Sequence, residues 1–171
     1  MPIEFLIFLT VFTPALVGGL NLIFNKNPNV RDTVTLLGAL ITFYFSANIF
    51  LGFDGQATQY RLATIMPGID ISFHIEPLGI IFSLLASGLW ILTHIYAIGY
   101  MRGAQEKNQP RFFFFFSVSI ASVMGISFSG NLFTLFLFYE LLTLITFPLV
   151  SHKGSSEALR GARVYLSILL G

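Results

Sequence analysis

The stretch Asn131-Leu-Phe-Thr-Leu-Phe-Leu-Phe-Tyr-Glu140-Leu-Leu-Thr-Leu-Ile-Thr-Phe-Pro-Leu-Val150 places one carboxylate deep inside an otherwise apolar segment. If the span is 132–150, its centre is residue 141, so Glu140 lies roughly 1.5 Å from the midplane along the helix axis. An acid at that depth is costly, and such residues typically face a bundle interior and carry ions or protons. We therefore predict that Glu140 carries protons. The alternative is a neutral, hydrogen-bonded acid that serves helix packing.

The composition is that of a membrane protein. The 171 residues are 55% hydrophobic and only 10% charged, with 20 phenylalanines. A net charge of +1 gives no indication of nucleic-acid binding, and the absence of cysteine excludes disulfides and thiol chemistry. The first apolar stretch continues to Phe24 without a small-residue cleavage site, so we expect a retained helix rather than a signal peptide.

Five apolar stretches are long enough to cross roughly 30 Å of hydrocarbon. They are 3–24, 33–53, 78–100, 111–129 and 132–150. The expected fold class is an all-α membrane protein, with five transmembrane helices plus the start of a sixth at about Glu157. Residues 1–171 would form a single transmembrane helical domain that ends inside this sixth helix. On this interpretation the chain is either a fragment or a subunit that a partner chain completes.

The polar boundaries support this division into helices. Pro110 suits the first turn of a helix, and Ser129-Gly-Asn131 is a short corner with Asn131 as a candidate N-cap. The segment 54–77 is too polar to span, and we expect it on the outer surface with a hairpin around Pro67-Gly68.

The basic residues predict an N-terminus outside the membrane. With that orientation Arg61 is alone in the outer loops, and the inner loops hold Lys26, Arg31, Arg102, Lys107, Arg111, Lys153, Arg160 and Arg163. No lysine or arginine is expected inside the five spans. Glu140 would therefore be protonated at rest, pair with His94, or receive a cation from another segment or another protein of a complex.

Three further residues are candidates for the proton path. His94 shares a helix face with Ser87 and titrates near neutral pH, so it could relay protons or simply pack against a serine or carbonyl. Thr143 shares the face of Glu140. Pro148 should kink the helix and free the carbonyl of Leu144 to bind water, unless the kink serves shape alone.

Other features of the sequence indicate structure rather than chemistry. Small residues recur on two helices and predict a tightly packed bundle: Ser117, Ala121, Gly125 and Ser129, and Gly79, Ser83 and Ser87. His74 and Glu76 are a weak metal pair, better explained as surface charge. We find no metal-ligand cluster, no nucleophile–base pair and no phosphate-binding loop.

Several motifs resemble one family of membrane proteins. Phe73-His-Ile-Glu76-Pro-Leu-Gly-Ile and Ile95-Tyr-Ala-Ile-Gly-Tyr-Met101 resemble the early helices of the antiporter-like subunits. These are the large proton-translocating subunits of respiratory complex I, Mrp-type cation/proton antiporters and membrane-bound hydrogenases. The resemblance covers about residues 3–171, and its later motifs are the aromatic helix from Arg111, Ser129-Gly-Asn-Leu132, Phe138-Tyr-Glu140-Leu-Leu and Tyr165-Leu166.

This resemblance implies a role for Glu140. It matches the family's fifth-helix glutamate, which pairs with a lysine on a later helix during proton transfer. The sequence contains neither that later helix nor the family's broken helices and second inverted repeat. Glu76 stands where many relatives carry an aspartate, and no family role transfers to His94.

The resemblance also implies a setting and a function. The chain would be part of a proton-translocating subunit of a multisubunit complex, with sodium exchange as an open alternative. It would lie in a bacterial or archaeal cytoplasmic membrane and use no cofactor of its own. The complex could be an oxidoreductase such as NADH:quinone oxidoreductase or an Mrp-type antiporter. The alternative function is a non-conducting structural or split subunit that holds such a complex together.

Overall fold

The computed structural model describes residues 2–56, 59–152 and 156–169. The elements in chain order are α1 (Ile3–Ile23), α2 (Pro28–Gly52), β1 (Gln59–Met66), β2 (Ile69–His74), α3 (Pro77–Gly103), α4 (Gln109–Ser127), α5 (Leu132–Val150) and α6 (Ser156–Leu169). The five helices α1 to α5 are long and apolar enough to cross a membrane. The expected fold class is confirmed in its main features: the chain is a mostly helical, multi-pass integral membrane protein with one β-hairpin and a sixth helix following the fifth.

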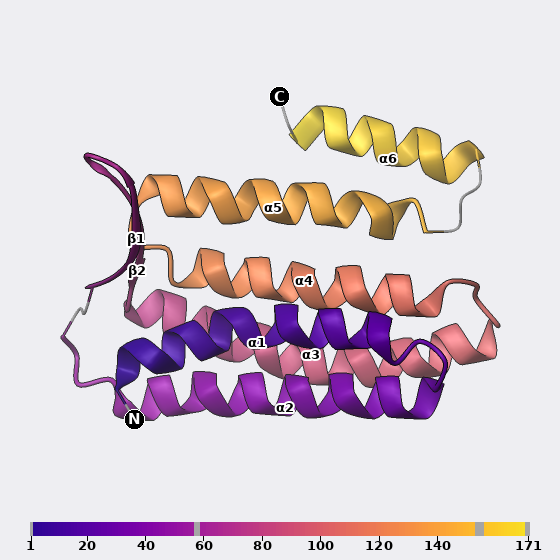
Figure 1. Cartoon of the computed structure of the whole chain (residues 1–171), viewed down its shortest axis with the longest axis horizontal. Helices are drawn as coiled ribbons and strands as arrows, with labels where there is room; N and C mark the ends of the chain where they lie inside the picture. Colours follow the sequence, from indigo (N-terminus) through magenta and orange to yellow (C-terminus); the bar gives the residue numbers. More distant parts are fainter. Residues whose placement is uncertain (1, 57–58, 153–155, 170–171) are drawn as a thin grey trace.

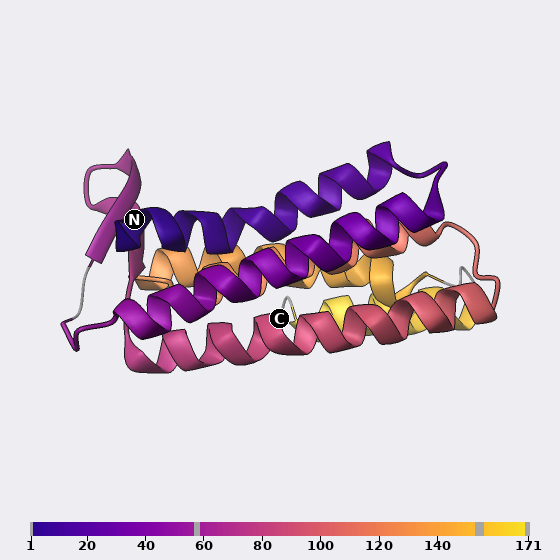
Figure 2. The same cartoon turned by 90° about the horizontal axis from the view of Figure 1, so that it is seen from below.

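Helices α1 to α4 form a closed four-helix bundle, in which α1 packs on α2, α2 on α3, α3 on α4 and α4 on α1. α5 packs on the outer side of α4, and α6 packs on α5, so the last two helices extend away from the bundle (Figure 1). Seen from below, α1 and α3 flank α2 on opposite sides (Figure 2). Successive helices alternate in direction, with the hairpin and the N-terminus at one end of the molecule (Figure 1).

Proline marks the start of three helices. Pro28, Pro77 and Pro110 each lie in the first turn, where a missing N–H costs no intrahelical hydrogen bond. Because α2 begins at Pro28 rather than at residue 33, Arg31 and Asp32 lie inside it. Both residues precede the stretch 33–53 that was expected to span, so they lie near the start of α2.

The hairpin expected around Pro67-Gly68 is confirmed. β1 and β2 pair antiparallel, and Gly68 has φ +87°, a conformation that favours glycine at a tight turn. The hairpin is attached to the α4–α5 corner by backbone bonds. The His74 N–H donates to the carbonyl of Phe128 over 2.8 Å, and the Gly130 N–H donates to the carbonyl of Ser72 over 2.8 Å.

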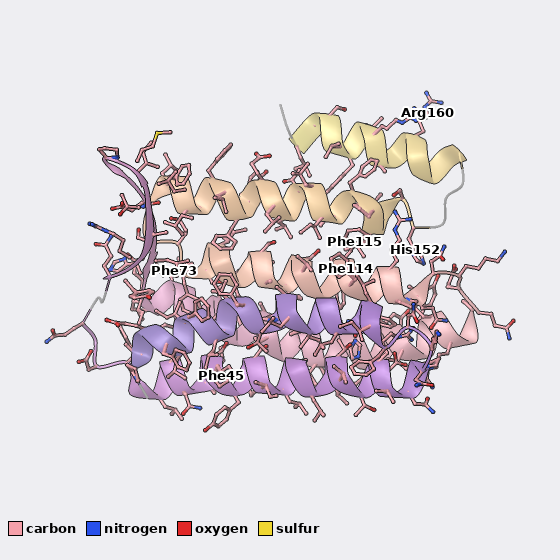
Figure 3. The ribbon with its side chains drawn as sticks, in the orientation of Figure 1. Phe45, Phe73, Phe114, Phe115, His152 and Arg160 are labelled. Carbon is pink, nitrogen blue, oxygen red and sulfur yellow. The ribbon has the colours of Figure 1, made fainter. Side chains whose placement is uncertain are left out.

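The bundle interior differs between its two ends. Apolar side chains fill the hairpin end, where the core cluster includes Ile7, Ile49, Phe73, Ile75, Ile80 and Phe138. Figure 3 shows Phe73 there and His152 at the opposite end. The small-residue faces pack closely as predicted: Ser117, Ala121 and Gly125 on α4 are buried, as are Ser83 and Ser87 on α3.

Candidate functional site

Glu140 lies near the middle of α5, whose bounds match the expected span. The residues one turn away on either side, Phe136 and Leu144, are 56% and 54% exposed. Glu140 itself is partly buried and lies beside these two exposed apolar side chains. Within the described residues, its carboxylate has no hydrogen bond or ion pair.

Thr143 and Pro148, the other two residues predicted near Glu140, both affect the backbone hydrogen bonding of α5. The Thr143 hydroxyl is buried and donates to the carbonyl of Tyr139 over 3.1 Å. α5 remains helical through Pro148 to Val150, and Pro148 lacks the N–H that would normally bond the carbonyl of Leu144. The hydration of that carbonyl stays a prediction.

His94 is fully buried on α3 and contacts α2. Its Nε2 lies 3.2 Å from the backbone carbonyl oxygen of Asp32. A carbonyl can only accept, so Nε2 donates the proton. Nδ1 has no partner in the described part of the chain, and the ring packs edge-on against Phe113 at 5.2 Å between centroids. These contacts are the ones expected of a packed histidine.

The structure does not bring His94 and Glu140 together. His94 is on α3 within the four-helix bundle, and Glu140 is on α5, which packs on the outer side of α4 (Figure 1). The sequence had left His94 open as a partner for Glu140. That option has no support in the described contacts.

The sequence analysis missed a buried ionic cluster between α2, α3 and α4. Asp32 Oδ1 accepts from Arg31 Nε at 2.9 Å, and Asp32 Oδ2 accepts from Arg102 Nε at 3.0 Å. Arg31 also donates from Nη2 to Gln109 Oε1 over 3.1 Å and lies over the Phe113 ring at 4.8 Å from its centroid. With side-chain exposures of 2% for Arg31 and 6% for Asp32, this pair is a core feature.

A line of polar side chains continues from this cluster towards α1. The Thr35 hydroxyl lies 2.7 Å from Asn21 Oδ1 and 3.0 Å from the carbonyl oxygen of Arg31. Asn21 Nδ2 donates to the Ser117 hydroxyl over 3.5 Å. Arg31 and Asp32 were expected in a loop because the second apolar stretch begins only at residue 33. The signal that they belong to a helix is Pro28, which is suited to a first turn just before them.

At the hairpin end, the side chains of His74 and Glu76 are in contact. His74 Nδ1 lies 3.0 Å from a Glu76 carboxylate oxygen, and both side chains are accessible to solvent. Among the residues that the structure describes, no group of three or more His, Cys, Asp or Glu residues could hold a metal ion.

The chain is similar to known membrane proteins. The family described as "NADH-Ubiquinone oxidoreductase (complex I), chain 5 N-terminus" matches residues 66–113. A probable K(+)/H(+) antiporter protein of Rhizobium meliloti is 31% identical over 133 residues, which are 76% of this chain and 13% of the relative. The NADH-quinone oxidoreductase subunit L of Neisseria meningitidis is 29% identical over 144 residues, which are 78% of this chain and 21% of that relative.

A solved structure has the same fold. The archaeal membrane-bound sulfane sulfur reductase, a respiratory membrane complex, contains a chain that superposes with a TM-score of 0.78 at 16% identity. The superposition covers 93% of this chain and 24% of that one. The chain belongs to the family of antiporter-like membrane subunits. It spans only 13% and 21% of the two relatives named above.

Proposed function

We propose that this chain is part of a cation/proton-translocating membrane subunit, in which Glu140 carries charge along the proton path. The observation behind this proposal is the position of Glu140: an acid at the middle of α5, on a face whose neighbours Phe136 and Leu144 are exposed. An unpartnered acid is costly in hydrocarbon, so this face needs a further polar or cationic group to cover it.

The relatives support the same proposal, because they include subunits of K(+)/H(+) and Na(+)/H(+) antiporters and of NADH-quinone oxidoreductase. The proposed partners are other membrane subunits of such a complex, in a bacterial or archaeal cytoplasmic membrane. The proposed ions are H⁺ and, for an antiporter complex, also Na⁺. Thr143 and the free carbonyl beside Pro148 would bind water next to Glu140.

The experiment that tests the proposal is Glu140→Gln in the full complex, in vesicles of its native membrane. Glutamine keeps the size and hydrogen-bonding capacity of the side chain but removes the titratable proton. We expect proton transport to fall strongly while the complex assembles at the wild-type level. Glu4→Gln, a change of an exposed acid near the start of α1, is the matched control.

Two results would overturn the proposal. One is wild-type proton transport in a fully assembled Glu140→Gln complex. The other is loss of assembly with unchanged transport per assembled complex, which would favour the non-conducting structural role. Sodium flux measured in the same vesicles separates proton transport alone from cation/proton exchange.

A further inference from the structure

A polar pocket lies where α3 joins α4. Figure 1 shows this connection at the end of the bundle opposite the hairpin. It has a volume of about 490 Å³ and is lined by Pro28, Asn29, Arg102, Gln105, Glu106 and Gln109. These residues come from the start of α2, the end of α3 and the start of α4. The pocket is thus at the level where the helices leave the expected hydrocarbon region.

Arg102 supplies a fixed positive charge to this pocket. Its Nε and Nη2 both donate to Asp32 Oδ2, while the side chain remains 43% exposed. The other oxygen of Asp32 accepts from Arg31. Two guanidinium groups therefore share one carboxylate, which leaves an excess of positive charge beside the pocket. Because its orientation is already set, Arg102 loses little freedom when it binds an anion.

Glu106 supplies a negative charge to the same pocket. Gln105, two residues after the end of α3, adopts φ +47°, and the Glu106 N–H then donates to the carbonyl of Met101 over 3.1 Å. This reversal places Glu106 at the rim. Among the described residues its carboxylate has no hydrogen bond or ion pair, and it does not pair with Arg102. Both charges are therefore available to a ligand.

An apolar groove adjoins the polar pocket. Its volume is about 430 Å³, and its lining includes Tyr96, Tyr100, Phe112, Phe116, Leu149 and, again, Glu106. Glu106 is thus shared by a polar pocket and an apolar groove. Tyr96 and Tyr100 are exposed and stack at 6.2 Å between ring centroids, six and two residues before Arg102. Tyrosines at this position are typical of the membrane–water interface.

We propose that this site binds a phospholipid whose headgroup carries both a phosphate and a primary amine. The phosphate accepts hydrogen bonds from the Arg102 guanidinium, the ammonium donates to the Glu106 carboxylate, and the acyl chains occupy the groove. A purely anionic headgroup leaves Glu106 unpaired beside a negative group. Free phosphate leaves the apolar groove unused, so the lipid is the expected source of the phosphate.

Native mass spectrometry of the complex extracted from its membrane tests this proposal. The probes are phosphatidylethanolamine, phosphatidylglycerol and phosphatidylcholine with identical acyl chains, each added separately. We expect phosphatidylethanolamine to be retained about tenfold more than the other two, because each of them lacks an N–H that can bond Glu106. Phosphatidylcholine keeps the positive charge, so it separates hydrogen bonding from simple charge attraction.

Two variants locate the site. Glu106→Gln should abolish the preference for phosphatidylethanolamine, and the exposed Glu4→Gln at the other end of the bundle should preserve it. Arg102→Lys keeps a cation opposite Asp32 but loses the guanidinium fork, so it should weaken retention of all three lipids. The unfolding temperature is measured for each variant. If Arg102→Lys does not assemble, the lipid preference of Glu106→Gln alone tests the proposal.

Three outcomes would overturn the proposal. They are equal retention of the three lipids by the wild type, an unchanged preference in Glu106→Gln, and displacement of the lipid by millimolar inorganic phosphate. The last outcome would assign the pocket to a free phosphate group.

Discussion

Arg102 and Asp32 form an ion pair between α3 and α2, although they lie 70 residues apart in the sequence. Asp32 also binds Arg31, so two guanidinium groups share one buried carboxylate. Removing one partner of a buried pair leaves an uncompensated charge and costs about 3–5 kcal/mol. We therefore expect Asp32→Ala to lower the free energy of unfolding by about that amount, measured by thermal or denaturant unfolding in mild detergent.

Asp70→Ala is the matched control for this prediction. Asp70 pairs with Arg61 on the hairpin at 2.9 Å, but the Arg61 side chain is largely exposed. Exposed pairs contribute about 0–1 kcal/mol, so this variant should unfold almost as the wild type does. Equal effects of the two variants would show that the Asp32 cluster does not stabilise the bundle.

Gly79 permits α3 and α4 to approach closely. A Cβ at this position would overlap the backbone carbonyl oxygen of Ser127, an atom that no side-chain rotation can move away. We expect Gly79→Ala to destabilise the protein by about 1–3 kcal/mol through overpacking. The measurement is again the free energy of unfolding in detergent.

Gly99→Ala provides the comparison on the same helix. A Cβ there meets no atom within 4 Å, so alanine should be neutral or slightly stabilising because of its higher helix propensity. If Gly79→Ala were as well tolerated as Gly99→Ala, the close approach of α3 and α4 would not be a constraint on the fold.

Asn131 attaches the hairpin to the start of α5. Its Oδ1 accepts from the Thr134 N–H over 2.7 Å, and its Nδ2 donates to the carbonyl of Asp70 over 2.7 Å and to the Ser72 hydroxyl over 2.9 Å. Asn131→Ala removes the cap and both contacts to β2, a loss of about 1–3 kcal/mol. We expect faster amide hydrogen exchange in β2 and in the first turn of α5.

The control for the hairpin prediction is Asn48→Ala on α2. Asn48 is partly exposed, and its side chain donates only to the carbonyl of Tyr44, one turn earlier on the same helix. Exchange in β2 should not change in this variant. Unchanged exchange in Asn131→Ala as well would mean that the backbone bonds at the α4–α5 corner hold the hairpin without the side chain.

The sequence predicted some of these features because their causes are local. The bounds of α5 follow from an N-cap at Asn131 and an uninterrupted apolar run, and the hairpin turn follows from Gly68. The cluster of Arg31, Asp32 and Arg102 was missed because its cause is tertiary. A hydropathy criterion treats adjacent charges as a loop, and only the position of α3 shows that they are neutralised inside the bundle.

The partner of Glu140 was beyond prediction for a related reason. Its neighbours Phe136 and Leu144 are more than half exposed, whereas no local pattern indicates which group lies beside the Glu140 carboxylate. The location of Glu140 within α5 was therefore predictable, but its electrostatic environment was not.

His94 should act as a packing residue rather than a proton relay. Its Nε2 donates to the carbonyl of Asp32, and it is separated from Glu140 by α4. His94→Gln can still donate this hydrogen bond but cannot carry a proton near neutral pH. We expect the glutamine variant to assemble and to transport protons at the wild-type rate in native membrane vesicles.

His94→Leu, which removes the donor, should lower the free energy of unfolding by about 1 kcal/mol with transport per assembled complex unchanged. A fully assembled His94→Gln complex with strongly reduced proton transport would instead identify His94 as a relay.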